Sequence, residues 1–202
     1  MVKNTIILIL PLLYAGMFTN SESQSFELDR NNASIIINGT STLHKWDMHL
    51  KAFDCKADFL MEGSRLRSIE NVSFSCNTTD LTSDNSLMDK KAYAAMNAPV
   101  FPEISFKMTS ATEILTGNAK FSSSMRGNLL VAGKSVSVSI PVEGAVFNEN
   151  GYSTITVSGE TELKMSDFGI SPPVLMLGAL KTGDRIMLTF SLKFLQKQEQ
   201  SI

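Results

Sequence analysis

Apolar and polar side chains alternate along nearly every segment of this chain, and this alternation limits its fold more than any other feature. In "SVSVSIPV", residues 135–142, every second side chain is Val or Ile. The same period occurs in residues 53–61, 72–76, 104–108, 125–131, 155–165 and 186–194. A period of two places successive side chains on opposite faces, so each run predicts a β-strand with one buried face. A change of phase near Gly144 predicts a bulge in one strand.

The number and length of these runs indicate the fold class. They are joined by short polar segments, which favours antiparallel neighbours. Several runs reach about ten residues, longer than the usual strand of about five or six, and long strands favour a closed barrel over two packed sheets. We therefore expect an all-β protein, a closed antiparallel β-barrel of about eight strands.

One segment breaks the alternation and predicts the only helix. Residues 86–99, "SLMDKKAYAAMNAP", begin with Ser86, a good N-cap with Asp89 three residues later, and end at Pro99, which stops a helix. The apolar side chains expected on its inner face are Leu87, Tyr93 and Met96. We expect this short helix to lie over an end or a side of the sheet.

The N-terminal segment has the pattern of a secretory signal peptide. Lys3 precedes an apolar run at residues 5–18, and small polar residues follow. The run is shorter than the roughly 20 residues that span a bilayer, although a retained membrane anchor is the alternative. Residues 1–23 are predicted to be removed, leaving one domain at residues 24–202. The mature protein is then expected to be exported, periplasmic or secreted, with no stable membrane span.

Charge and motifs argue against several function classes. The 202 residues carry 18 Lys and Arg and 20 Asp and Glu, a net charge of −2, with no basic stripe for nucleic acid. His44 and His49 would face opposite sides of a strand, so they do not predict a metal site with Asp47. The chain shows neither a nucleophile elbow nor a glycine-rich phosphate loop. We expect no catalytic residues, no cofactor and no metal, and the pattern leaves the oligomeric state open.

Cys55 and Cys76 lie on two neighbouring predicted strands. If the two strands form a hairpin with its turn centred between Arg65 and Leu66, the two cysteines face each other on the inner side. In an exported protein this register predicts a disulfide. Two buried free thiols are the alternative.

Three stretches of the sequence resemble the YceI-like family of exported bacterial proteins. They are "INGTSTLHKWDMHLKAFDCKADF", "DLTSDNSLMDKKAYAAMNAPVFPEISFKMTS" and "MSDFGISPPVLMLGALKTGDRIMLTFSLKF". The resemblance, with these motifs in the family's order, covers essentially the whole of residues 24–202. The resemblance implies a lipocalin-like β-barrel whose apolar interior holds a polyisoprenoid or another long-chain lipid, with no established enzyme activity. It also implies that the last stretch forms an apolar loop near a barrel end, which caps the cavity or plugs the core.

Alternation and resemblance together identify the expected ligand-lining residues. They are Phe59, Phe74, Phe106, Leu129, Val138, Val157, Phe168, Leu188 and Phe190. Recognition of a lipid head group would fall to polar residues near a mouth, such as His44, Lys45 and Lys181. Alternation alone favours a dry packed core over a ligand cavity, and an interaction or structural protein with such a core is the alternative. An enzyme acting on a lipid-like substrate is a further alternative.

Overall fold

The computed structural model describes residues 23–117, 119–149, 152–175 and 180–197. Strands dominate, with one α-helix and three short 3₁₀ helices among the described residues. Along the chain the elements are β1 (Ser23–Gln24), β2 (Phe26–Leu28), η1 (Arg30–Asn32), β3 (Ser34–Ser41), β4 (Lys45–Leu50), β5 (Asp54–Glu62), β6 (Arg65–Asn77), η2 (Thr78–Asp80), β7 (Leu81–Thr82), α1 (Ser86–Ala95), β8 (Glu103–Ala111), β9 (Leu115–Gly117), β10 (Lys120–Val131), β11 (Lys134–Glu149), β12 (Tyr152–Lys164), η3 (Met165–Phe168), β13 (Val174–Leu175) and β14 (Leu180–Gln196).

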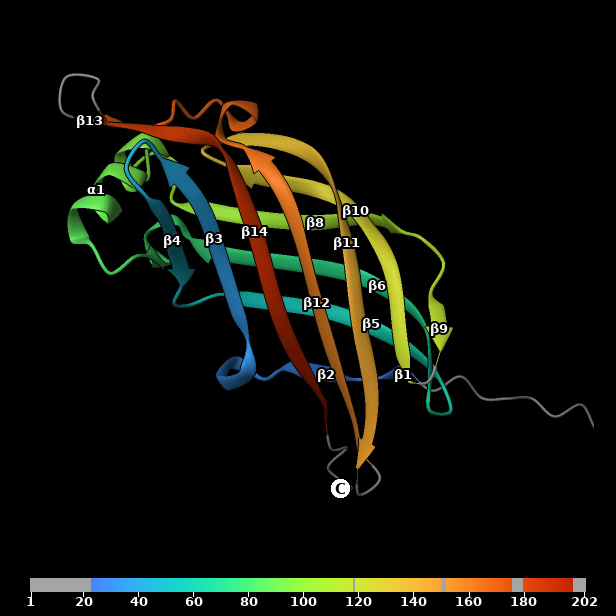
Figure 1. Ribbon diagram of the computed structural model, residues 1–202. Coiled ribbons are helices and arrows are strands. Elements are labelled where there is room, and N and C mark those ends of the chain that lie inside the picture. The colour runs from blue at the N-terminus through green and yellow to red at the C-terminus, as the bar shows by residue number, and fades with distance from the viewer. Residues whose placement is uncertain (1–22, 118, 150–151, 176–179, 198–202) are drawn as a thin grey trace, which may run out of the picture.

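The strands form one curled antiparallel sheet (Figure 1). Its order is β1-β5-β6-β8-β10-β11-β12-β14-β3-β4-β7, so that the first long strand after the N-terminal segment, β3, pairs with the last strand, β14. Among the described residues no ladder joins β4 to β5, and the hydrogen bonding does not run around a full circle. The expected all-β antiparallel fold with one short helix is confirmed. The closed barrel is not confirmed, because the sheet curls without closing. The count of eight strands is not confirmed either.

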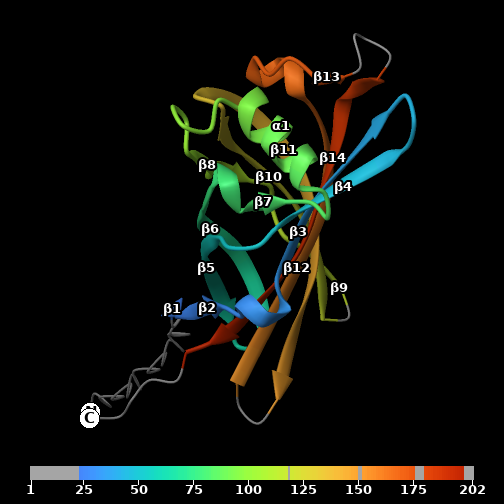
Figure 2. The ribbon, with the colours of Figure 1, turned by 90° about the vertical axis from the view of Figure 1, so that its left-hand side faces the viewer.

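A short N-terminal segment bridges the gap at one end of the sheet. β1 pairs with β5, while β2, two residues later, pairs with the end of β14. Phe26 of β2 packs edge-on against Phe59 of β5 with ring centroids 5.2 Å apart, and Phe59 packs in the same way on Phe194 of β14 at 5.0 Å. We call this the closed end of the sheet. Figure 2 shows β1, β2 and the end of β14 together there, opposite α1.

Helix α1 lies over the other end, which we call the open end. The side chain of Asn85 accepts hydrogen bonds from the backbone amides of Leu87 and Met88, so the N-cap is Asn85 and not Ser86. The helix ends at Ala95, and Asn97, which follows the C-cap Met96, adopts the left-handed conformation with φ 51°. The amides of Asn97 and Ala98 bond back to the carbonyls of Ala94 and Tyr93, a Schellman motif that ends the helix before Pro99.

Alternation along the strands determines which side chains face inward, as the sequence predicts. The predicted bulge near Gly144 is wrong, because the β10–β11 and β11–β12 ladders run through Gly144 without a shift in register. Val142 and Val146 are both buried, on the same face as Gly144, and Phe147 is exposed. Within the described part of the chain, no helix is long and apolar enough to cross a membrane.

Candidate functional site: an apolar cavity at the open end

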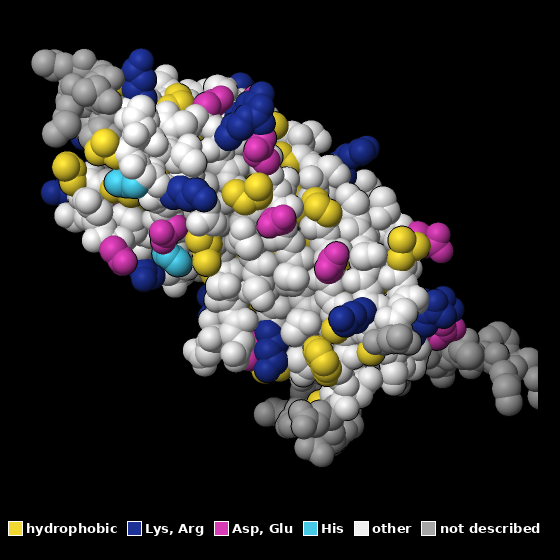
Figure 3. Space-filling model, in the orientation of Figure 1, with side chains coloured by type: hydrophobic (Ala, Val, Ile, Leu, Met, Phe, Trp, Pro, Cys, Tyr) yellow, Lys and Arg dark blue, Asp and Glu magenta, His cyan; other side chains and the backbone are white. Residues whose placement is uncertain are grey.

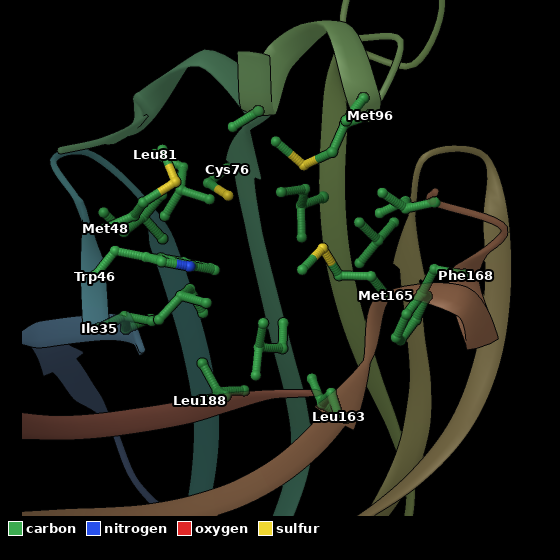
Figure 4. A pocket seen from close by; sticks show the side chains of 18 of the residues that line it. Ile35, Trp46, Met48, Cys76, Leu81, Met96, Leu163, Met165, Phe168 and Leu188 are labelled. Carbon is green, nitrogen blue, oxygen red and sulfur yellow. The ribbon is translucent and has the colours of Figure 1, made fainter. Parts of the chain in front are cut away.

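The inner face of the sheet surrounds a cavity of about 470 Å³ beneath α1 (Figure 4). In Figure 4, Ile35, Trp46 and Met48 point into it from one side, and Met165 and Phe168 point in from the opposite side. The polar residues that line it are Ser41, His44, Asn85, Lys91, Lys181 and Thr182, and all other described lining residues are apolar. Such a cavity, apolar and with polar groups confined to a few positions, has the character of a small-molecule site.

The apolar cavity lies in the half of the sheet near the open end. Along β14, the side chains of Ile186, Leu188, Phe190 and Leu192 line the cavity, while Phe194 lies in the packed aromatic cluster of the closed end. In that closed half, Leu66, Val142 and Ile155 are at most 2% exposed. The inner face of the sheet therefore lines a cavity at the open end and contributes closely packed residues to the core at the closed end.

Helix α1 contributes one face to the cavity. The lining residues are Met88, Lys91, Ala92, Ala95 and Met96. Their spacing of three and four residues places them on one side of a helix. Of the side chains predicted to face inward, Met96 is buried, Leu87 lies at the rim and is 58% exposed, and Tyr93 anchors the helix. The hydroxyl of Tyr93 lies 3.0 Å from the carbonyl oxygen of Thr79 and 2.9 Å from that of Leu81.

Trp46 forms one wall of the cavity because of the glycine opposite it. Gly39 of β3 and Trp46 of β4 are paired residues, and the indole lies over Gly39 so closely that a Cβ there would be 2.1 Å from Cζ2. The indole Nε1 donates a hydrogen bond of 3.0 Å to the carbonyl of Thr40. Sequence reasoning did not assign Trp46 to the site, although Trp46, Met48 and Leu50 alternate in a way that could have indicated it.

The apolar loop between β12 and β14 forms the wall opposite Trp46. Its lining residues are Met165, Phe168, Ile170 and Pro173, and residues 176–179 lie outside the described part of the chain. Ser166 donates hydrogen bonds from its amide (2.8 Å) and hydroxyl (2.6 Å) to the carboxylate of Asp184, and they lower the pKa of that carboxyl group. These bonds hold η3 against β14. The described part of the loop therefore borders the cavity, and it does not fill it.

Cys55 and Cys76 both line the cavity as free thiols, and the predicted disulfide is not formed. The turn lies at residues 63–64 instead of between Arg65 and Leu66, and two irregularities in the β5–β6 ladder shift the register. Cys55 consequently lies opposite Phe74, two residues from Cys76. Burial raises the pKa of each thiol to about 12, and the charges of Asp80 and Glu103 add to the effect at Cys76. Both thiols are therefore protonated at neutral pH and are poor nucleophiles.

The structure divides the predicted ligand-lining residues into two groups. Six line the cavity: Phe74, Phe106, Leu129, Phe168, Leu188 and Phe190. The other three, Phe59, Val138 and Val157, are buried but do not line it. Their inward direction was predicted correctly, but Phe59 belongs to the packed closed end.

The polar candidates also separate in space. His44, in the turn between β3 and β4, and Lys181, near the start of β14, line the mouth of the cavity, whereas Lys45 does not. His49 lies outside the cavity lining, with its Nε2 atom 2.7 Å from Oδ2 of Asp47. Lys91 is a rim residue that sequence reasoning missed, and its place on the inner helical face could have identified it.

Comparison with known proteins identifies the family. The sequence profile of the YceI-like domain matches residues 23–194, which includes all the elements that form the cavity. The chain belongs to the YceI-like family. The resemblance seen in the three sequence stretches is therefore confirmed. None of the curated proteins compared matches this YceI-like chain.

Solved structures share the fold of this YceI-like protein at low sequence identity. BcnA of Burkholderia cenocepacia aligns with a TM-score of 0.62 and 16% identity, over 83% of this chain and 99% of that one. The YceI protein of Campylobacter jejuni aligns with a TM-score of 0.60 and 20% identity, over 74% and 84%. A polyisoprenoid-binding domain from Saccharophagus degradans aligns with a TM-score of 0.62 and 8% identity, over 86% and 99%. At these identities the structures support the fold.

Proposed function

We propose that this protein is an exported, non-enzymatic carrier that binds a polyisoprenoid or a similar long-chain lipid in the cavity at its open end. The observation that carries this proposal is a cavity of about 470 Å³ with apolar walls, in a chain of the YceI-like family. A solved protein with the same fold is a polyisoprenoid-binding domain, which supports this class of ligand.

Burial of the lipid chain supplies the main favourable free energy of binding. Each CH₂ group removed from water contributes about 0.8 kcal/mol, so about ten groups contribute roughly 8 kcal/mol, which would correspond to a Kd on the order of micromolar before the costs of association. A longer isoprenoid buries more groups, and this additional burial offsets those costs. Five methionines line the cavity: Met48, Met88, Met96, Met125 and Met165. Their unbranched thioethers adapt to irregular shapes, which suits a methyl-branched isoprenoid.

The ionisable groups in the cavity favour binding over catalysis. Cys55 and Cys76 are held protonated by burial, so neither is an activated nucleophile. His44 and the lysines lie at the mouth, on the rim elements, and not beside a buried reactive group.

The direct test is extraction of the exported protein with organic solvent, followed by mass spectrometry of the extract. We expect one long-chain lipid in near-stoichiometric amount. The matched pair of variants is Ala92→Phe, which fills the cavity from α1, and Ala94→Phe, which places the same ring on the exposed face of the helix. Ala92→Phe should remain folded and lose the lipid, whereas Ala94→Phe should keep it.

A dry core would give a different result. Wild-type protein that carries no lipid and takes up no isoprenoid in titrations would refute the carrier function. In a packed core, Ala92→Phe would also overpack and destabilise the fold by about 1–3 kcal/mol.

Export is tested by the N-terminus of the mature protein. We expect the exported protein to begin between Asn20 and Phe26, with cleavage after Ser23 as the central prediction. Ser23 and Gln24 form β1 and pair with β5, so cleavage after Ser23 would leave one residue of β1, and cleavage after Gln24 would remove it altogether. Intact mass spectrometry measures this directly, and a mass that retains residues 1–18 would instead indicate an anchored protein.

A further inference from the structure

The charges that border the cavity are all of one sign. Among the described lining residues, the charged side chains are Lys91 and Lys181, with His44 as a third ionisable group, and no Asp or Glu is present. The whole chain has more acidic than basic residues, 20 against 18. The absence of carboxylates from the cavity is therefore a local feature and does not follow from composition.

The basic residues come from three separate elements around the mouth. Lys91 is on the cavity face of α1, Lys181 is near the start of β14, and His44 is in the turn between β3 and β4. Figures 1 and 2 both place these elements at the open end of the sheet. A lysine in such a position lays its aliphatic stem along the apolar wall and keeps its ammonium group at the water boundary.

Neither ammonium group is neutralised by a carboxylate of the described chain. The cations in the described ion pairs are Arg30, His49, Arg67, Arg185 and Lys193. The carboxylate nearest to Lys91 along α1, Asp89, accepts hydrogen bonds of 2.7 Å from the amide and hydroxyl of Ser83. Within the described part of the chain, Lys181 bonds to Thr42 through its backbone alone: its amide donates to Oγ1 of Thr42, and its carbonyl accepts from the amide of Thr42. Both ammonium groups therefore remain available to a ligand.

We propose that the ligand is a single-chain amphiphile with an anionic head group, a phosphate or a carboxylate, which Lys91 and Lys181 bind at the mouth. This inference rests on the proposed lipid binding and adds the chemical class of the head group. The chain enters the cavity, and the head group remains between α1 and the start of β14. Lysine ammonium groups are compact point charges that suit phosphate oxygens, and Ser41, Asn85 and Thr182 supply further polar groups at the rim.

The test compares three ligands with the same isoprenoid chain and different heads. Purified, delipidated full-length protein is titrated with farnesol, farnesoic acid and farnesyl phosphate below their aggregation concentrations. Trp46 is the single tryptophan of the chain and lies in the cavity wall, so its fluorescence reports occupancy. At low salt we expect at least one anionic ligand to bind about tenfold more tightly than the alcohol, the combined effect of two partly exposed charge pairs. The comparison of farnesoic acid with farnesyl phosphate identifies which anion is preferred.

A matched pair of double variants separates the mouth from general electrostatics. Lys91→Gln with Lys181→Gln should reduce the anionic preference to less than about threefold and leave the affinity for farnesol unchanged. Lys45→Gln with Lys90→Gln removes the same charge from neighbouring lysines that do not line the cavity, and it should retain the preference.

Two outcomes would overturn the inference. One is equal affinity of the wild-type protein for all three ligands, and the other is the same loss of preference in both double variants. Failure of all three ligands to bind would instead refute the proposed lipid binding itself.

Discussion

At the scale of single residues, Trp46 and Gly39 show how a local close approach shapes the site. The indole forms part of the cavity wall only because its partner on β3 has no side chain. The hydrogen bond from Nε1 to the carbonyl of Thr40 satisfies the one polar atom of the ring. Because of this pair, the largely polar sequence "NGTSTLHKW" contributes an apolar surface to the cavity wall.

We expect Gly39→Ala to displace Trp46 from the cavity wall. The added Cβ would lie 2.1 Å from Cζ2 of the indole, so the ring must move. Overpacking of this kind costs about 1–3 kcal/mol, and it should also weaken lipid binding and shift Trp46 emission to longer wavelength. The control is Gly117→Ala, where a Cβ would meet nothing within 4 Å. A Gly39→Ala protein with wild-type emission and affinity would contradict this account of the wall.

The two cavity thiols predict how stability depends on alkaline pH. Burial raises their pKa from the ordinary value of 9.0 to about 12, so the folded protein keeps both protonated where the unfolded chain ionises. Their contribution to stability is fully present below pH 9 and is lost progressively as the pH rises from 9 towards 12. Denaturant midpoints measured at pH 8 and pH 10.5 should fall more steeply for the wild type than for Cys55→Ala/Cys76→Ala. Equal slopes would show that the thiols are not desolvated.

At the scale of secondary-structure elements, α1 acts as a cover that three side chains hold in place. Asn85 caps its first turn, Asp89 bonds back to Ser83, and Tyr93 bonds to the chain around η2 and β7. None of the residues within the helix itself is fully buried, so these polar contacts add to the partial packing of Met88, Ala92 and Ala95 on the core. The cover is therefore the part of the site expected to open for ligand exchange.

Tyr93→Phe should make the cover open more readily. Loss of the hydroxyl removes the hydrogen bond to the carbonyls of Thr79 or Leu81, which is worth about 1 kcal/mol. In stopped-flow measurements of Trp46 fluorescence, both association and dissociation of the ligand should become severalfold faster, with Kd changed by less than about twofold. Tyr152→Phe, on an exposed side chain of β12, serves as the control. Unchanged rates would mean that the ligand enters by another route.

At the scale of the whole molecule, the chain combines a cavity and a packed core on one continuous inner face. The side of the molecule seen in Figure 3 differs, since acidic and basic side chains are interspersed on it without a large patch of either sign. Leu192 lines the cavity and Phe194, two residues later on β14, is packed among aromatic rings. The boundary between the two halves acts as a floor for the ligand chain.

This floor predicts a limit on chain length. Affinity should rise about fourfold for each added CH₂ group while the chain fills the cavity, and then level off. Leu192→Ala lowers the floor and should move the plateau to longer chains. Val142→Ala truncates a residue that is 1% exposed outside the cavity, so it should destabilise the fold and leave the plateau in place. An unbroken rise in affinity with length, or the same plateau in Leu192→Ala, would contradict the position of the floor.

The inward direction of the site residues could be predicted from the sequence, whereas the boundary between cavity and packed core could not. Alternation correctly placed Phe59 and Phe74 on the inner face, because side-chain direction in a strand depends only on parity. It could not show that Phe74 borders a cavity while Phe59 is packed. The difference depends on the N-terminal segment, which places Phe26 against Phe59 at the closed end. The cysteines were predicted to face each other because the turn was placed between Arg65 and Leu66. The turn at residues 63–64 would put Cys55 opposite Val72, and the two ladder irregularities, which left no sequence signal, move it only as far as Phe74.

The N-terminal segment that bridges β5 and β14 has a consequence for how the protein can be attached to anything else. β1 begins and β14 ends at the closed end, away from the mouth. A surface linker or a fused domain joined directly before β1 or directly after Lys197 would therefore start from the side opposite the cavity. Protein immobilised through either of these two points should present its mouth to solution and take up ligand as the free protein does.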